Sequence, residues 1–471
     1  MDSSLLQPQG AATVADDLSA LAWVHEELRK SLESAHKALN RCLKDVSQGL
    51  SDMDDIDPAI LRTARLQIHQ GAGALEMAGL SAGAAMLRAS EAVVAKFVMR
   101  PQAITRGAVE DIERASFALL DYITRKLAGK AIAATELFPQ YEALMARAGT
   151  GLPRPTDLWA QDWPTVSLEA PLTAPDDARA RATDETIVDD FESGILSLLR
   201  RQQPQDALDL SRLCAGLAAE AEARKSAREV ATWMLASGFF EGVANGRVPL
   251  NVHAKRVLSQ LLSQLRGLVR HQASPSDRLA NELLFFCAQA QGTPADEQSV
   301  LARVRHTFGL DRHQPVNLGA SVLGRHDPAW IAQAAKRVAS AKDGWSAVAG
   351  GELLRMSGLG EQFALVSDSL QRLFAQGQLL SAALTDAVAA TTQSAQPPQP
   401  ALAMEVATSL LYIEACIEDS EFDHPEQAER LQRLAHRIEE VRQGHPAQPL
   451  EAWMEDLYRR VSDRQIGRAH V

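Results

Sequence analysis

The chain has 471 residues, a formal net charge of −12 and only 5% aromatic residues. This length is enough for about three domains, and the abundant Ala, Leu, Gln, Arg and Glu favour helix over sheet. The negative charge argues against a general nucleic-acid binder and against binding to anionic membranes, since both need a positive surface. We therefore expect an all-α protein of tandem antiparallel helical bundles joined by linkers.

The cysteine spacing and the hydropathy of the sequence indicate in which cellular compartment the protein is found. The four cysteines lie far apart in apolar helical contexts and form no CxxC pair, as expected of buried thiols in a reducing cytosol. No apolar run approaches the roughly 20 residues that span a bilayer. The start MDSSLLQPQGAATVADD lacks the features of a signal peptide. We expect a cytoplasmic protein that does not insert into membranes.

The first predicted domain is a helical bundle at 16–148, after a disordered N-terminus at 1–15. Apolar residues recur at helical spacing from Leu21 to Cys42 and predict one long amphipathic helix. Asp57 and Pro58 form an N-cap and proline pair, which predicts the start of a second helix. Three further predicted helices close an antiparallel bundle, near 81–99, 108–127 and 137–146.

The remainder is predicted to be a linker followed by two more helical domains. Five prolines and little periodicity mark an extended linker at 149–183, whose Trp159 and Trp163 are expected to dock back on the first bundle. A second helical domain is predicted at 184–315. A third, at 327–465, begins with another N-cap and proline pair, Asp327 and Pro328.

The last six residues, IGRAHV at 466–471, can be encoded by a DNA sequence that is not of natural origin. They are the translation of ATC GGA AGA GCA CAC GTC, which reads as a common sequencing-library adapter. We expect these residues to be adapter read-through and the natural sequence to stop near Arg464 or Gln465. The chain would then be an amino-terminal fragment of a longer protein.

The stretch ARLQIHQGAGALEMAGL at 64–80 is the main candidate for chemistry. Each glycine costs about 1 kcal/mol relative to alanine inside a helix, so the glycines beside His69 need a reason, and close approach by another molecule is one. His69 is turned about 100° from the apolar Ile68 and is predicted to be partly exposed. It shares an edge of the helix with Arg65, Ala72, Gly73 and Glu76.

The other histidines and two threonines in repeated segments are expected to have structural rather than catalytic roles. His25 and His36 are expected to be surface histidines, and His306, His313 and His326 to be loop histidines, so no metal or cofactor is expected. The tetrapeptide EVAT occurs at 229–232 and at 405–408, in a register that makes Thr232 and Thr408 equivalent to His69. A helical threonine more often bonds to its own backbone, and we expect that role for both.

The stretch 64–80 resembles the active helix of histidine phosphotransfer (Hpt) domains. That family carries a histidine, a lysine at the third following position and then a glycine. Here His69, Gly73 and Gly79 match, whereas Ala72 stands where lysine is expected. The resemblance implies that His69 exchanges a phosphoryl group with a receiver domain. Arg65, one turn earlier, is the candidate for the missing positive charge.

A wider resemblance covers nearly the whole chain. It looks like the amino-terminal region of PilL/ChpA-type proteins, the CheA-like hybrid histidine kinases of type IV pilus chemosensory systems, and it is similar to the FimL scaffold protein, including its second domain. The resemblance implies degenerate Hpt-like bundles ahead of a kinase core. No Asn-box helix or DxGxG-type nucleotide lid occurs, so this chain is not expected to be an enzyme. The matching segments, in chain order, are LAWVHEELRKSLESAHKALNR, LEMAGL, ERASFALLDYI, LFPQYEALM, GFFEGVANGRVPLNVHAKRV and LLFFCAQA.

Three functions remain open from the sequence. The first is a scaffold fragment of a type IV pilus chemosensory histidine kinase, acting in phosphorelay signalling that controls twitching motility. The second is an active phosphotransfer protein that shuttles phosphate through His69. The third is a helical repeat scaffold unrelated to phosphorelay. The expected partners are response-regulator receiver domains and pilus chemosensory proteins.

Overall fold

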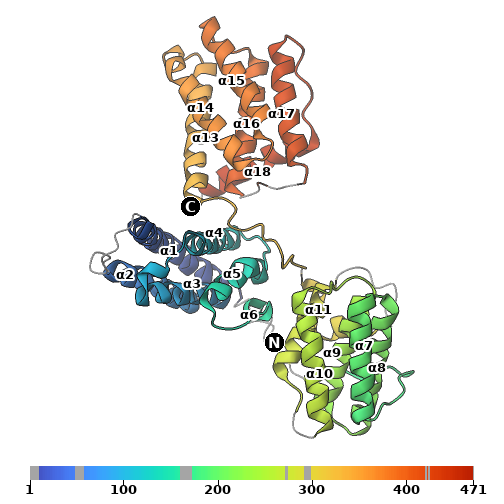
Figure 1. Cartoon of the computed structure of the whole chain (residues 1–471). Coiled ribbons are helices and arrows are strands. Elements are labelled where there is room, and N and C mark those ends of the chain that lie inside the picture. Colours follow the sequence, from blue (N-terminus) through green and yellow to red (C-terminus); the bar gives the residue numbers. More distant parts are fainter. Residues whose placement is uncertain are drawn as a thin grey trace, which may run out of the picture. The chain divides into compact units, whose positions relative to one another are not determined.

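The computed structural model describes residues 10–47, 58–159, 172–270, 274–290, 299–313, 315–419, 422 and 425–469. Eighteen α-helices and no strand occur within these ranges, and 78% of the residues are helical (Figure 1). The predicted all-α fold is confirmed. The contacts divide the chain into two units: unit 1 comprises Met1–Tyr122 and Ala131–Leu323, and unit 2 comprises Ile123–Lys130 and Gly324–Val471.

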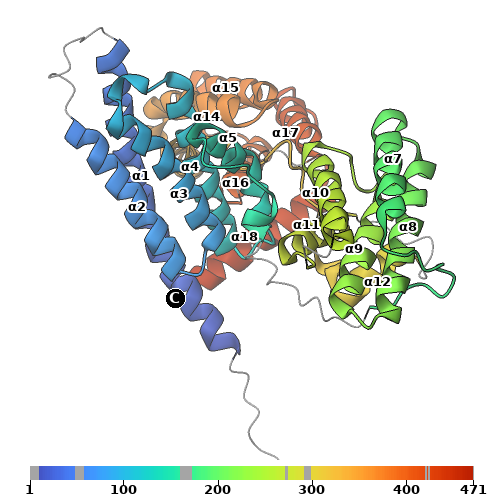
Figure 2. The same ribbon diagram turned by 60° about the horizontal axis from the view of Figure 1, so that its bottom comes forward.

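The first bundle of unit 1 contains five helices and two short 3-10 turns. The predicted helix start at Pro58 is confirmed, whereas the first helix begins at Gly10, inside the segment predicted to be disordered; residues 1–9 of that segment lie outside the described residues. Figure 2 shows α1 and α2 side by side. The elements are α1 (Gly10–Ser47), α2 (Pro58–Met77), α3 (Ser81–Met99), η1 (Pro101–Ala103), α4 (Arg106–Leu127), η2 (Ala134–Leu137) and α5 (Phe138–Ala148).

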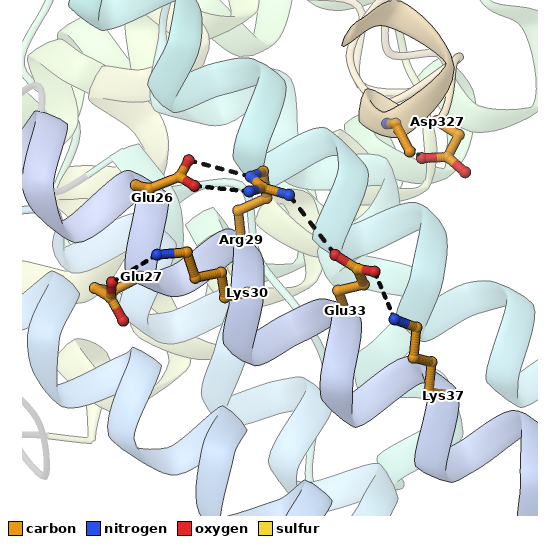
Figure 3. Close-up of polar contacts among 8 residues, drawn as sticks. Glu26, Glu27, Arg29, Lys30, Glu33, Lys37 and Asp327 are labelled. Atoms are coloured by element: carbon orange, nitrogen blue, oxygen red, sulfur yellow. Dashed lines mark hydrogen bonds and ion pairs between the residues drawn. The ribbon is translucent and has the colours of Figure 1, made fainter. Parts of the chain in front are cut away.

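Apolar periodicity decides which faces of these helices are buried. In α2 the residues spaced by three and four positions are fully buried, namely Leu61, Ala64, Ile68 and Leu75. The exposed face of α1 carries ion pairs between residues one turn apart, such as Glu26–Arg29 at 2.7 Å and Glu33–Lys37 at 2.7 Å (Figure 3). These pairs are about half exposed and contribute little, so the bundle is held together mainly by its apolar core.

The second helical region of unit 1 is built around α9. Nearly every residue from Val230 to Phe240 in this helix is buried. Aromatic rings pack edge to face around it, including Phe191 against Trp233 and Phe239 against Phe286. The elements are α7 (Glu185–Arg201), α8 (Pro204–Ala223), α9 (Ala227–Ala244), α10 (Val252–Val269), α11 (Asp277–Gln289), α12 (Val300–Thr307) and η3 (Leu310–Arg312).

The segment predicted to be an extended linker contains a short helix, α6 (Thr156–Trp159). Trp159 is 2% exposed and belongs to the core of the second region, where it packs against Phe285. The indole therefore packs on α11, an apolar surface that the prediction did not name, while helix α6 also contacts α3 and η2 of the first bundle. Trp163 lies outside the described residues.

Unit 2 contains six α-helices among its residues beyond 323. The Asp327 carboxylate accepts a hydrogen bond from the Ala329 amide at 2.8 Å, which confirms the predicted N-cap and proline pair. The predicted adapter residues 466–469 form the end of α18, and 470–471 lie outside the described residues. The elements are α13 (Pro328–Ala349), η4 (Leu353–Arg355), α14 (Met356–Leu373), α15 (Gly377–Ser394), α16 (Pro400–Glu418), α17 (Gln427–Arg442) and α18 (Ala452–Ala469).

One helix among the described residues, α16, has the length and composition of a membrane span, with a mean hydropathy of 1.4. It packs against α13, α17 and α18, and 56% of the apolar window is buried inside the protein. Its three buried polar residues are satisfied internally: Glu405 forms a bidentate pair with Arg437 at 2.8 and 2.9 Å, and the Thr408 and Ser409 hydroxyls donate to backbone carbonyls one turn earlier. A central core helix accounts for this apolar composition.

All four cysteines are free and buried, which confirms the sequence prediction. Burial raises the pKa of the Cys287 thiol to about 12 and also raises that of the Cys214 thiol. These thiols are therefore protonated and enclosed at neutral pH, so they behave as small apolar core residues.

Candidate functional site

His69 lies on the solvent side of α2. Its side chain is 67% exposed, whereas the preceding Ile68 is completely buried. The predicted partial exposure is therefore confirmed. The 100° turn between neighbouring helical residues explains the contrast, because the apolar stripe of α2 faces α1 and α3.

A carboxylate from the neighbouring helix α3 holds the imidazole. Glu91 Oε2 lies 2.9 Å from His69 Nδ1, and Glu91 Oε1 accepts a hydrogen bond from Arg65 Nε at 3.0 Å. The Glu91 side chain is only 16% exposed. Burial by itself raises the pKa of Glu91, but the hydrogen bonds from His69 and Arg65 outweigh it and hold the pKa below its usual value.

The ionised carboxylate fixes the tautomer of the imidazole. A carboxylate can only accept hydrogen bonds, so the proton of a neutral His69 lies on Nδ1 and the lone pair lies on Nε2. If Nε2 bonds to a phosphorus atom, the ring becomes cationic, and the nearby Glu91 carboxylate stabilises that charge. The pair can therefore orient an imidazole nucleophile and support its charged product.

Arg65 is close to His69 but is not a free cation. Its guanidinium binds the same carboxylate as the imidazole. On α3, Arg88 pairs with Glu76 at 2.5 Å. The cations around His69 are thus already matched by two glutamates, and Arg65 would have to exchange Glu91 for a phosphoryl oxygen in order to offset phosphate charge.

Ala72 does not share the exposed edge predicted for it. It is 2% exposed and faces the interior of the bundle. The helical spacing placed Ala72 on the same edge as His69, but Ala72 also lies one turn after the buried Ile68, and the packing of the neighbouring helices covers it. The position where the Hpt family carries lysine is therefore a core position in this protein.

The three glycines near His69 have different roles. A Cβ on Gly71 would lie 2.7 Å from Leu28 Cδ1, so this glycine lets α1 pack closely against α2. A Cβ on Gly73 would meet no atom within 4 Å, which leaves open space one turn after His69. Gly79 has a φ of +74° and ends α2, where the Leu80 amide donates to the Leu75 carbonyl at 2.8 Å. Only Gly73 retains the proposed role in access to the histidine.

Glu91 is the site residue that sequence reasoning missed. It lies 22 positions after His69, and its partnership depends on the register between α2 and α3. A signal was present, because Glu91 is the only acidic residue of α3. A groove of about 340 Å³ lies elsewhere, between α1 and α4, and is lined by other side chains, including Asn40 and Lys44.

The second helical region is similar in sequence to a known protein family. Residues 176–318 match the FimL scaffold protein second domain. No curated protein and no solved structure matches the chain. The matched residues include α7 to α12 and η3, and we refer to them as the FimL-like region.

Of the histidines expected at the surface or in loops, His313 is buried and His36 is half-buried. In the FimL-like region, His313 is 6% exposed, accepts a hydrogen bond from Trp159 Nε1 at 3.4 Å, and has its pKa lowered by burial to about 4. In the first bundle, His36 Nε2 lies 2.9 Å from Ser116 Oγ, and burial lowers the pKa of His36 to about 4. The helix contacts that cover both rings are not visible in local sequence patterns.

The two threonines of the EVAT segments have the predicted structural role. Thr232 Oγ1 donates to the Arg228 carbonyl, and Thr408 Oγ1 donates to the Met404 carbonyl, each at 2.8 Å. Both residues are 1% exposed. They do not reproduce the exposed position of His69.

Proposed function

We propose that the chain is a scaffold of type IV pilus chemosensory signalling. The observation that carries this proposal is the match of residues 176–318 to the second domain of the FimL scaffold protein. The proposal extends to a place in phosphorelay control of twitching motility, as the amino-terminal part of a longer histidine kinase. In this role the chain holds receiver domains and pilus chemosensory proteins and performs no ATP chemistry itself.

Binding measurements test the scaffold role. The purified full chain is titrated by calorimetry with each receiver domain and pilus chemosensory protein encoded in the same genome. Saturable binding to at least one of them is expected, and His69→Ala should bind that partner equally well if scaffolding does not require the imidazole. Absence of binding to every one of these proteins would favour a helical scaffold unrelated to phosphorelay.

We propose as a second function that His69 accepts a phosphoryl group. The hydrogen bond between His69 Nδ1 and Glu91 favours it, because this bond leaves Nε2 as the nucleophile on an exposed side chain. The group would come from the aspartyl phosphate of a receiver domain. Nε2 forms a bond to phosphorus, the bond from phosphorus to the aspartate oxygen breaks, and the aspartate leaves as a carboxylate.

Label transfer from a phosphorylated receiver tests this second function. Acid-labile label is expected on the wild-type chain and not on His69→Ala. Glu91→Gln should slow labelling by at least about tenfold, because it weakens stabilisation of the cationic ring. His445→Ala is the matched control, since His445 is also an exposed histidine beside a glutamate, with Nδ1 3.2 Å from Glu440.

The outcomes separate the two functions. An unlabelled wild-type chain that still binds the receiver would contradict phosphate acceptance and leave the scaffold role intact. Label that persists on His69→Ala would place the acceptor at another residue.

A further inference from the structure

Residues 153–159 connect the first bundle to the FimL-like region, and we call them the strap. They precede the residues that match the FimL family model and belong to a segment expected to be linker. All contacts described below lie within unit 1. The strap has partners on both of its sides.

A buried ion pair attaches the strap to α11. Arg154 Nη1 lies 2.6 Å from Glu282 Oε1, and Gln260 Nε2 donates to the other carboxylate oxygen at 3.0 Å. The Glu282 side chain is only 6% exposed. Burial raises the pKa of Glu282, and the charge of Arg154 opposes that rise. Without Arg154 the region would contain a buried carboxylate with no cation bonded to it, which is strongly destabilising.

The strap also completes the apolar core of the FimL-like region. The Trp159 ring packs edge-on against Phe285, with ring centroids 5.4 Å apart. The Arg256 guanidinium of α10 donates to the Pro153 carbonyl at 3.0 Å. The apolar core therefore includes Trp159, which lies before the first matched residue, 176.

The other side of the strap contacts the first bundle. Burial and the nearby Asp157 carboxylate together raise the pKa of Tyr141 of α5 to about 12. Asp157 Oδ2 accepts a hydrogen bond from the Arg154 amide at 2.9 Å, so the carboxylate that faces α5 is bonded to the residue that binds α11. Helix α6 packs against α3, the helix that carries Glu91.

We infer that the strap makes the first bundle and the FimL-like region one cooperative folding unit. A change at the Glu282 pair on α11 then alters the stability of α5 and α3, and with it the support of the His69 site. This coupling goes beyond the proposed scaffold function and does not depend on phosphorylation of His69.

Hydrogen exchange of the full chain tests the coupling. Arg154→Met should lower amide protection by at least about tenfold in peptides of α10 and α11 and also in peptides of α5. Arg266→Met is the matched control, because its pair with Glu192 on the same region is more than 40% exposed on both partners. This control should leave protection unchanged in both places.

A double variant and the wild-type chain complete the test. In Arg154→Met, the added change Glu282→Gln should restore part of the lost protection on both sides of the strap, because it removes the buried charge. In the wild-type chain, exchange measured across a urea series should show one unfolding midpoint for α5 and for α10 and α11. Separate midpoints, or a loss of protection in Arg154→Met confined to one side of the strap, would overturn the inference.

Discussion

At the scale of single residues, the chain places imidazole rings in two contrasting environments. The His69 ring is exposed to solvent, and its Nδ1 atom contacts the Glu91 carboxylate. This environment suits a side chain that contacts a partner protein. His36 is half-buried and His313 is buried, and burial holds the pKa of each at about 4. These two rings are neutral in the folded protein above that pH, whereas the same rings in the unfolded chain titrate near the ordinary value of about 6.5.

This difference predicts loss of stability in mild acid. Between pH 6.5 and 4 the unfolded chain binds protons at these histidines and the folded chain does not, so stability is fully present above 6.5 and falls as the pH falls towards 4. Each such histidine contributes up to about 1.4 kcal/mol per pH unit in this window. Urea unfolding at several pH values should show a shallower dependence for His36→Gln. His436→Gln, at an exposed ring, controls for the substitution itself, and a slope in His36→Gln equal to that of the wild type would contradict the prediction.

At the scale of elements, the clearest local sequence signals are those that begin and end helices. Proline at the first turn begins α2 and α13, and left-handed residues end several helices. Gly79 meets that requirement at the end of α2 with a φ of +74°, whereas Gln202 adopts a φ of +51° at the end of α7. A side chain in this conformation costs about 1 kcal/mol or more relative to glycine.

Gln202→Gly should therefore stabilise the protein by about 0.5 kcal/mol, after the larger backbone entropy of glycine in the unfolded chain is subtracted. The neighbouring Gln203 has a φ of −85°, so Gln203→Gly relieves no strain and should destabilise by a similar amount. The free energy of unfolding in urea measures both changes. A Gln202→Gly variant less stable than the wild type would show that the glutamine side chain has a compensating contact.

The elements also show how far sequence reasoning reaches. Helix periodicity predicted the exposure of His69, because the 100° turn from Ile68 follows from 3.6 residues per turn. It could not predict Glu91 as the partner of His69, since that contact requires the register between two helices. The four-residue helix α6 was missed as well, because tertiary contacts of Trp159 and Arg154 hold it in place and no periodicity can develop over so short a length.

At the scale of the whole molecule, composition alone was sufficient to predict helical bundles, and tertiary packing decided where one region ends and the next begins. Proline content marked 149–183 as a linker, yet residues 153–159 contribute a buried indole to the FimL-like core and a half-buried arginine that pairs with the buried Glu282. Composition describes the average tendency of a segment, whereas a single tryptophan placed against Phe285 is enough to fix its position.

The burial of Ala72 limits which side chains can stand three positions after His69. A lysine at this position would place the stem of its side chain among core residues, where volume changes of this size cost about 1–3 kcal/mol. A cation could therefore be introduced here only together with compensating changes in the surrounding helices.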